Sequence, residues 1–274
     1  MKITENNYQL AEIAAIQVFS TATSGANKPL FIQGRDINTQ KSNRYVLKYR
    51  GAERMDERTS ARELLAALLA KELGIFVPEP VVILVNDIFV NGLKDHTDYY
   101  NIIKSKGINF GCEFVVGDSD MSQKTHLTAV QLQQAMQVFV FDLMIQNADR
   151  RLEKPNFFIA KDNIYIIDHE LGFGFLDTFA FLRSSKPFIF NETDVNSAKN
   201  HFFYTKLRNI REQNFDAAFL PFEQFNRNFW NCIDAIIPVE WQTNEIPQIK
   251  THINQILDNI HLFKQEIWTK LLNQ

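Results

Sequence analysis

Residues 139–175 read FVFDLMIQNADRRLEKPNFFIAKDNIYIIDHELGFGF, and this stretch decides how the rest of the chain is interpreted. It begins as the end of an apolar helix and continues through the polar turn 147–151. Two short β-type runs follow, residues 156–160 and 164–167, with a polar turn between them. The order predicts a buried helix, a polar loop and a β-hairpin, with Asp168 directly after the second strand.

Three polar side chains lie on this loop and hairpin. Asp149 lies on the loop, Asn156 begins the first β-type run and Asp168 follows the second. Phosphoryl transfer requires such a set, with one Asp to orient an acceptor hydroxyl and an Asn and an Asp to hold magnesium. Magnesium prefers oxygen ligands, which carboxylates and amides supply. The alternative is that these residues only cap and turn the chain, because Asp and Asn favour turns.

The composition excludes several classes of protein. The chain has 274 residues, of which 45% are hydrophobic and 22% are charged, and its net charge is −3. These values are typical of a globular protein and argue against one that coats nucleic acid, so we expect no direct nucleic-acid binding. Cys112 and Cys232 lie too far apart for a zinc motif, and we expect free thiols in a reducing compartment.

The first residues lack the apolar core of a signal peptide. No apolar run is long enough to span a bilayer. We therefore expect a soluble, cytoplasmic protein without a membrane segment.

A turn of small residues, STATSGANKP at 20–29, separates two β-type runs near the start of the chain. Small residues let the backbone approach a ligand closely, and successive N–H groups can cradle phosphate. The turn contains one glycine, Gly25, and matches neither common glycine-rich phosphate motif. A phosphate loop and a plain hairpin turn both remain open interpretations.

Residues 44–50, RYVLKYR, predict a strand. Alternation places Tyr45, Leu47 and Tyr49 on one face and Lys48 on the other. A lysine in this setting either protects an exposed sheet edge or binds phosphate.

A helix is predicted over residues 59–74, with Ser60 as the N-cap and Gly74 at its end. Glu63 has two interpretations. It can complete a capping box with Ser60, or it can pair with Lys48 and fix that lysine on nucleotide phosphates. Helix geometry favours the capping box, and the pairing with Lys48 rests only on the order along the chain.

Further strands are predicted at 81–85, 88–90 and 110–116, and a polar boundary follows at 117–128. In a two-lobed nucleotide enzyme, the position of 110–116 in this order is the hinge where backbone groups bind adenine.

Two helices complete the prediction. Thr128 begins one of them with Gln131 as its capping-box partner, and residues 136–145 are nearly apolar on all sides, which indicates a buried helix. Apolar residues recur at steps of three and four over 249–271, which predicts one long amphipathic helix. Core packing explains this stripe, and a seam with a partner helix is the alternative.

Together these stretches resemble a HipA-like kinase domain, from the bacterial relatives of HipA toxins that share the protein-kinase and phosphatidylinositol-kinase fold. The matching segments, in chain order, are SGANKPLFI (24–32), YVLKYRG (45–51), ARELLAALLAKELGIFVPEPVVILV (61–85), FGCEFV (110–115), NADRRLEKPNFFIA (147–160), IIDHELGF (166–173) and IPVEW (237–241). The resemblance implies an α+β, bilobal fold. Its N-lobe, 1–116, would be small and β-rich with one regulatory helix, and its C-lobe, 117–274, larger and helical.

The resemblance also implies a chemistry, which is transfer of the ATP γ-phosphate to a Ser or Thr hydroxyl of a protein. Lys48 would bind the phosphates and Glu63 orient it, while Asp149 would face the acceptor hydroxyl. Asn156 and Asp168 would hold Mg²⁺. The residues implied to contact nucleotide are Lys48, Ser24, Gly25, Ala26, Glu113 and Phe114. An antitoxin-like or regulatory protein partner is a further implication.

Three features depart from this family pattern. The metal-binding Asn of kinases usually lies five residues after the catalytic Asp, where this chain has Lys154, and Asn156 comes two residues later. If Asn156 is not the ligand, Lys154 would lie at the phosphates and replace an ion with a side-chain charge. His169 and Glu170 follow the metal Asp in place of Phe and Gly. The extra N-terminal subdomain of HipA toxins is also expected to be absent.

Two alternative functions remain open at this point. One is a small-molecule or lipid kinase on the same fold, and the other is a pseudokinase that binds a partner. The hydroxyl-rich loop 20–24 is also expected to be self-phosphorylated, with Ser24 as the first candidate, because the enzymes that the chain resembles are regulated through a serine there.

Overall fold

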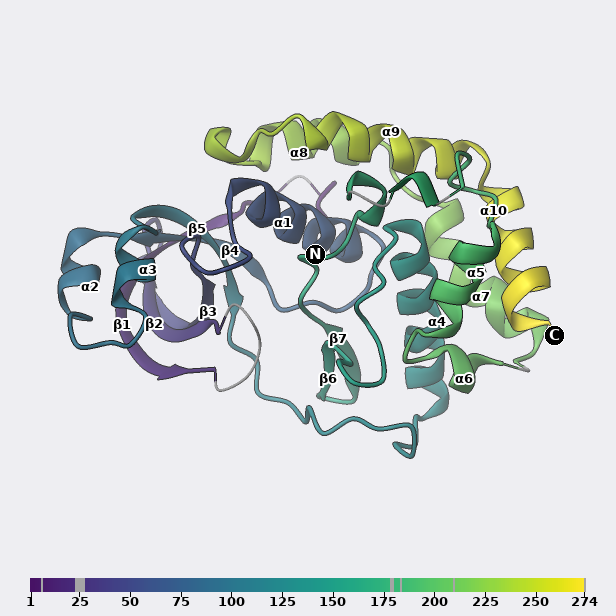
Figure 1. Ribbon diagram of the computed structural model, residues 1–274, viewed down its shortest axis with the longest axis horizontal. Helices are drawn as coiled ribbons and strands as arrows, with labels where there is room; N and C mark the ends of the chain where they lie inside the picture. The colour runs from purple at the N-terminus through teal and green to yellow at the C-terminus, as the bar shows by residue number, and fades with distance from the viewer. Residues whose placement is uncertain (6, 23–27, 178–179, 183, 209, 274) are drawn as a thin grey trace.

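The computed structural model describes residues 1–5, 7–22, 28–177, 180–182, 184–208 and 210–273. Figure 1 shows strands gathered into a barrel at one end of the molecule and most of the helices at the other. A small β-hairpin lies between them. The chain combines many helices with mostly antiparallel strands, so the predicted α+β class is confirmed.

The barrel closes in the order β1-β2-β3-β5-β4. All neighbouring strands are antiparallel except β1 and β4, which are parallel. The strands are β1 (Ala11–Thr21), β2 (Leu30–Asp36), β3 (Ser42–Lys48), β4 (Pro80–Val85) and β5 (Gly107–Glu113).

Side chains alternate between the barrel interior and its outside, as the period of two requires. Tyr45, Leu47 and Tyr49 are buried, whereas Lys48 between them is only partly buried on the opposite face. The predicted faces of this strand are therefore confirmed.

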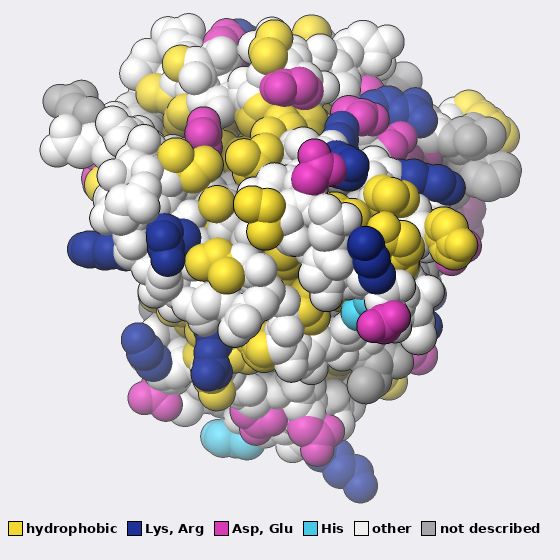
Figure 2. Space-filling model, turned by 90° about the vertical axis from the view of Figure 1, so that its left-hand side faces the viewer, with side chains coloured by type: hydrophobic (Ala, Val, Ile, Leu, Met, Phe, Trp, Pro, Cys, Tyr) yellow, Lys and Arg dark blue, Asp and Glu magenta, His cyan; other side chains and the backbone are white. Residues whose placement is uncertain are grey.

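Figure 2 views the barrel end of the molecule and shows basic and acidic side chains mixed among hydrophobic ones. On that face, the described residues do not form the basic stripe typical of nucleic-acid binding.

Helix α1 (Glu57–Glu72) begins earlier than predicted. Its N-cap is Asp56, whose carboxylate accepts the N–H of Thr59 at 2.7 Å. Ser60 lies inside the helix, where its buried hydroxyl has no hydrogen-bond partner among the described residues. The capping box of Ser60 with Glu63 was therefore wrong, because Asp56 already supplies the cap. Glu63 is left available for another partner.

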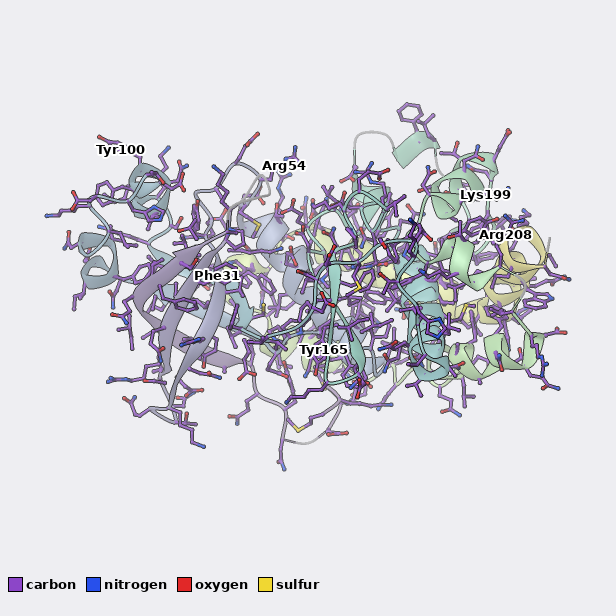
Figure 3. All side chains as sticks on the ribbon, turned by 90° about the horizontal axis from the view of Figure 1, so that it is seen from below. Phe31, Arg54, Tyr100, Tyr165, Lys199 and Arg208 are labelled. Atoms are coloured by element: carbon purple, nitrogen blue, oxygen red, sulfur yellow. The ribbon has the colours of Figure 1, made fainter. Side chains whose placement is uncertain are left out.

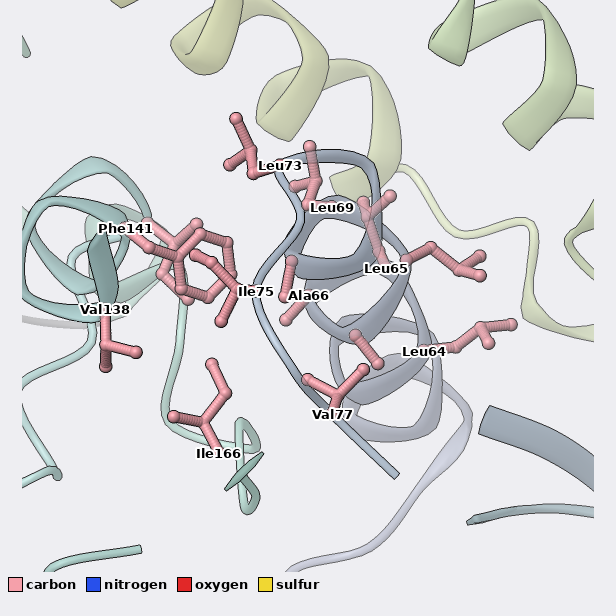
Figure 4. Close-up of a cluster of buried hydrophobic side chains, with 14 of the residues drawn as sticks. Leu64, Leu65, Ala66, Leu69, Leu73, Ile75, Val77, Val138, Phe141 and Ile166 are labelled. Carbon is pink, nitrogen blue, oxygen red and sulfur yellow. The ribbon is translucent and has the colours of Figure 1, made fainter. Parts of the chain in front are cut away.

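One apolar face of α1 forms the centre of the core. Figure 4 shows Leu64 and Leu69 of α1 in one buried cluster with Phe141 of the helix at 129–144 and Ile166 of the hairpin. These four side chains are fully buried. The core therefore continues from α1 into this helix and the hairpin.

Two short helices, α2 (Asp87–Asn91) and α3 (Tyr99–Ile103), lie between β4 and β5. The strand predicted at 88–90 was wrong, because Asn86 caps a helix by accepting the N–H of Phe89 at 2.9 Å. The N-terminal part thus contains more helices than the one regulatory helix that was expected.

Helix α4 (Ala129–Met144) begins at the predicted capping box of Thr128 and Gln131. The hairpin of β6 (Phe157–Ala160) and β7 (Asn163–Ile166) follows, as predicted. The remaining elements are η1 (Gly174–Leu176), η2 (Ala180–Leu182), α5 (Glu192–Lys199), α6 (Tyr204–Leu207), α7 (Glu212–Glu223), α8 (Phe229–Ile236), η3 (Val239–Trp241), α9 (Glu245–Asp258), α10 (Ile260–Ile267) and the π-helical turn η4 (Trp268–Leu272).

The single long helix predicted over 249–271 was wrong. Asn259 separates α9 from α10 with a backbone outside the helical region, at φ −122° and ψ 33°. Ile249, Ile253 and Ile267 are still buried on both sides of the break. The apolar spacing therefore predicted burial correctly, but it could not reveal the break.

Among the described residues, no helix has the length and apolar character needed to cross a membrane. Cys112 and Cys232 are free thiols, as expected.

Candidate active site

Three predicted site residues meet where the barrel faces the hairpin. Lys48 ends β3, Glu63 lies on α1 and Asp168 follows β7. The Lys48 ammonium donates to a Glu63 carboxylate oxygen and, at 2.8 Å, to Oδ1 of Asp168. The structure therefore brings together residues that are 120 positions apart in the chain.

The charges of this group stabilise one another. Burial lowers the pKa of Lys48, but Asp168 and Glu63 outweigh it and hold that pKa well above its ordinary value. Burial raises the pKa of Glu63, but Lys48 and a hydrogen bond from His169 bring it below its ordinary value. The pKa of Asp168 is likewise lowered by two lysines that outweigh burial. All three side chains are therefore charged at neutral pH.

Asp149 lies on the other side of Asp168, with 6% of its side chain exposed. Lys154 contacts Oδ2 of Asp149 at 2.7 Å and Oδ2 of Asp168 at 2.9 Å. The Asn156 side-chain amide donates to the same Asp149 oxygen at 3.2 Å. Both Lys154 and Asn156 therefore reach the site, although sequence spacing had presented them as alternatives.

The two residues expected to hold metal have left-handed backbones. The φ angle is 52° at Asn156 and 61° at Asp168. Asn and Asp adopt this region more readily than other residues that carry a side chain. This preference explains why these residue types fit the start of β6 and the end of β7, where the chain turns toward the site.

A buried arginine holds the backbone at Asn156 and next to Asp168. Arg150 is fully buried, and its Nε donates to Oδ2 of Asp142 on α4 at 2.6 Å. The same guanidinium donates to the backbone carbonyls of Asn156 and, at 3.5 Å, Ile167. Arg150 thus ties helix α4 to Asn156 and to the residue before Asp168.

The Asp142 carboxylate has two further hydrogen-bond partners. The Asn147 side chain donates to it at 2.9 Å, and His201 Nε2 lies 3.0 Å from it. Burial raises the pKa of Asp142, but Arg150 and His201 outweigh it and hold the pKa far below its ordinary value. Sequence reasoning missed this network. Asp142 is the one charged residue in the sequence of α4, and this was the signal that could have identified the network, since a buried charge requires partners.

Helix α1 is tied to the helical end by a second arginine that sequence reasoning missed. Arg62 makes two hydrogen bonds with the Glu245 carboxylate on α9, at 2.9 and 3.0 Å. It also contacts Asp177 at 3.1 Å. Because Arg62 precedes Glu63, this contact restrains the part of α1 that faces Lys48.

The residues expected to contact nucleotide are placed only in part. Ser24, Gly25 and Ala26 lie outside the described residues. The backbone N–H of Glu113 donates to the Glu79 carbonyl, and that of Phe114 donates to the Arg44 carbonyl, both at 2.9 Å. A base bound here would thus meet their carbonyl oxygens or side chains rather than these N–H groups.

Aromatic side chains surround this segment. The Phe114 ring lies 5.4 Å from that of Phe31 and 6.0 Å from that of Phe19. Figure 3 places Phe31 on the barrel and Tyr165 on the hairpin. Tyr165 stacks on Phe158 with ring centroids 5.4 Å apart. Aromatic faces are thus present on both the barrel and the hairpin.

Oxygen donors suited to magnesium converge at Asp168. Ligand atoms of Glu63, Asp168 and Glu170 all lie within 4.8 Å of one another. Burial and the neighbouring Asp168 raise the pKa of Glu170 to about 7. Carboxylate and amide oxygens are the ligands that Mg²⁺ prefers, so this donor set fits the ion. Sequence reasoning did not identify Glu170 as a candidate ligand, although its place two residues after Asp168 was noted.

A family model described as HipA-like kinase matches residues 15–271, which is nearly the whole chain. No curated protein matches the chain. Among solved structures, the crystal structure of the Helicobacter pylori proinflammatory kinase CtkA has a TM-score of 0.53 at 12% identity, covering 96% of this chain and 100% of that one. At this identity the likeness concerns the fold. The Neurospora crassa PAN3 pseudokinase gives a TM-score of 0.32 at 14% identity, covering 93% of this chain and 64% of that one. That score is too low to support an argument.

Proposed function

Since the chain belongs to the HipA-like kinase family, we propose that it transfers the γ-phosphate of ATP to a Ser or Thr hydroxyl of a protein, with Mg²⁺ as the metal. One observation carries this proposal. Lys48 on β3 contacts both Glu63 of α1 and Asp168 after β7. A strand lysine held by a helix glutamate next to the metal-binding Asp is the arrangement that kinases require for phosphate binding.

Each side chain has a role in this reaction. Lys48 neutralises charge on the phosphates, and Glu63 keeps its ammonium in position. Asp149 orients the acceptor hydroxyl and takes its proton. The new bond forms between the acceptor oxygen and the γ-phosphorus, while the bond between that phosphorus and the bridging oxygen of ADP breaks.

Asn156 and Asp168 would hold Mg²⁺, with Glu170 as an additional oxygen donor nearby. The ion, when bound, supplies positive charge to the phosphates of ATP. Ligand atoms of Glu170 and Asp168 lie within 4.8 Å of each other, which supports Glu170 as a donor beside Asp168.

We place the nucleotide between an N-lobe of residues 1–116 and a C-lobe of residues 117–274. In this proposal, Ser24, Gly25 and Ala26 cover the phosphates, and Glu113 and Phe114 form the hinge. The aromatic rings around Phe114 support a site for a base there. A cytoplasmic location and a regulatory or antitoxin-like protein partner belong to the same proposal.

Nucleotide binding tests the proposal. ATP with Mg²⁺ should raise the melting temperature, since a ligand that binds only the folded state adds about 2.7 kcal/mol at a hundred times its Kd. Lys48→Ala and Asp168→Ala should reduce the shift, whereas Lys41→Ala, an exposed lysine just before β3, should keep it. An unchanged wild-type melting temperature at millimolar ATP would overturn the proposal.

A pseudokinase is the second candidate, and a specific contact favours it. The Lys154 ammonium contacts one carboxylate oxygen of Asp149 and one of Asp168, the two aspartates that a kinase uses for catalysis and metal binding. Phosphoproteomes of cells carrying wild type or Asp149→Ala separate the two functions. Ser and Thr sites that are lost in the variant support a protein kinase. ATP binding with identical phosphoproteomes and no ATP consumption favours a pseudokinase, and ATP consumption without protein sites favours a small-molecule or lipid acceptor.

A further inference from the structure

Asp168 is contacted by two ammonium groups at once. Its Oδ1 accepts from Lys48 at 2.8 Å, and its Oδ2 lies 2.9 Å from the ammonium of Lys154. Lys154 also contacts Oδ2 of Asp149 at 2.7 Å. The Lys154 ammonium therefore lies between the carboxylates of the two aspartates.

We propose that Lys154 is a built-in cation that takes the place of one of the two divalent ions of a kinase site, so that this protein binds ATP with a single divalent ion. The inference rests on the proposed function. Protein kinases hold two Mg²⁺ ions with the Asp after the hairpin and the Asn of the catalytic loop. The usual position of that Asn is Lys154 in this chain.

An ion and the lysine cannot occupy the same position. Mg²⁺ requires oxygens at about 2.0–2.1 Å in near-octahedral geometry. Lys154 already contacts one oxygen of each aspartate. An ion bound between these two oxygens would have to displace an ammonium of the same sign of charge.

The backbone holds Lys154 at this position. The Lys154 carbonyl accepts the N–H of Arg151 at 3.1 Å, and the Lys154 N–H donates to the Arg151 carbonyl at 3.2 Å. Pro155 follows directly and restricts the backbone of the residue before it. The side chain thus starts from a closed turn rather than from a freely moving loop.

The contacts leave Lys154 with capacity for a ligand. An ammonium has three N–H donors, and two of them are accounted for by Asp149 and Asp168. The third can bind a phosphate oxygen. Each Asp168 oxygen contacts one ammonium but has a second lone pair, so Asp168 would share the one remaining ion with Asn156. Lys154 therefore supplies a fixed single positive charge where other kinases bind a second ion.

Counting bound ions tests the inference. Mn²⁺ replaces Mg²⁺ as a probe, and electron paramagnetic resonance measures the Mn²⁺ bound to the protein with the non-hydrolysable analogue AMP-PNP. Wild type should bind one Mn²⁺ per nucleotide complex. Lys154→Asn, which restores the usual Asn, should bind two, and Lys154→Arg, which keeps the charge, should bind one. Lys161→Asn is the matched control on the exposed hairpin turn and should also bind one.

A second measurement uses no metal. In EDTA, Lys154→Asn should weaken AMP-PNP binding about tenfold relative to wild type, because a charge-assisted contact to phosphate is lost, whereas Lys161→Asn should not change it. Two Mn²⁺ ions in wild type, or a single ion in Lys154→Asn, would overturn this inference and leave the proposed kinase function intact. Failure of wild type to bind AMP-PNP with Mn²⁺ would overturn both.

Discussion

The two sides of the site are built in different ways. On the barrel side, Lys48 meets Glu63 on helix α1, which Arg62 ties to α9. On the other side, the loop that carries Asp149 rests on a buried polar network around Asp142. The barrel side depends on the ion pairs of Lys48 and Arg62 and on the position of a helix, whereas the loop side depends on several hydrogen bonds inside the core. Damage to the supports should therefore reduce activity first on the barrel side and stability first on the loop side.

Arg150→Met should have the largest effect. The change leaves Asp142 buried without its main partner, and breaking a buried ion pair in this way costs about 3–5 kcal/mol. Arg151→Met is the matched control, because the neighbouring side chain is 50% exposed and its contact with Asp149 is 3.4 Å long. It should cost less than about 1 kcal/mol. Urea unfolding measures both, and similar losses in the two variants would contradict the comparison.

Acid should destabilise the contact between α4 and α9. His252 on α9 lies next to the carbonyl of Met144, the last residue of α4, at 3.1 Å. Burial lowers the pKa of His252 from 6.5 to about 4. Between these pH values the unfolded chain binds a proton that the folded chain does not, so the free energy of unfolding falls as the pH falls. The loss should reach about 3 kcal/mol near pH 4 and be absent above pH 7.

His252→Gln is the variant that isolates this effect, since an amide can donate to the Met144 carbonyl without titrating. Urea unfolding at pH 7.5, 6 and 5 should show a weaker pH dependence in this variant than in wild type. The same slope in both proteins would mean that another group, such as His201, causes the acid sensitivity.

Arg62→Met should lower the rate of phosphate transfer in addition to the free energy of unfolding. The change removes the two hydrogen bonds to Glu245 and should lower the free energy of unfolding by about 2 kcal/mol. It should also lower phosphate transfer about tenfold, because Glu63 is then less well held against Lys48. Arg58→Met is the control on the same helix, since the Arg58 side chain is 64% exposed. Equal transfer rates in both variants would show that Arg62 does not position Glu63.

Substitutions at the start of α1 should have the smallest effect on the free energy of unfolding. Asp56→Ala removes the N-cap and should cost about 1 kcal/mol. Ser60→Ala removes a buried hydroxyl that has no partner among the described residues, so it should be neutral or slightly stabilising. The reverse order of the two losses in thermal unfolding would restore Ser60 as the cap.

Local sequence signals predicted much of the fold. The period-two pattern around Lys48 gave the correct faces of β3, and Thr128 with Gln131 marked the start of α4. These signals succeed because the partner residues are near in sequence. Asn259 breaks a helix that the apolar spacing continues through, since the periodicity reports burial and not backbone geometry.

Chain order suggested one contact of the site, that of Lys48 with Glu63, although helix geometry had favoured a capping box for Glu63. The contact of Lys48 with Asp168 was not predicted. The supports of the site were not predicted, because the contacts of Arg62 with Glu245 and of Asp142 with His201 join residues far apart in the chain. Their partners depend on tertiary packing, which no local pattern in a single sequence specifies.

The most direct measurement is transfer of labelled γ-phosphate. Wild type and Asp149→Asn would be incubated with labelled ATP, Mg²⁺ and a dephosphorylated extract of cells that lack the protein. We expect label on Ser and Thr residues with wild type and a loss of at least about a hundredfold in the variant, which is the lower range for removal of a general base. Absence of label with folded wild type, or equal label with both proteins, would contradict this expectation.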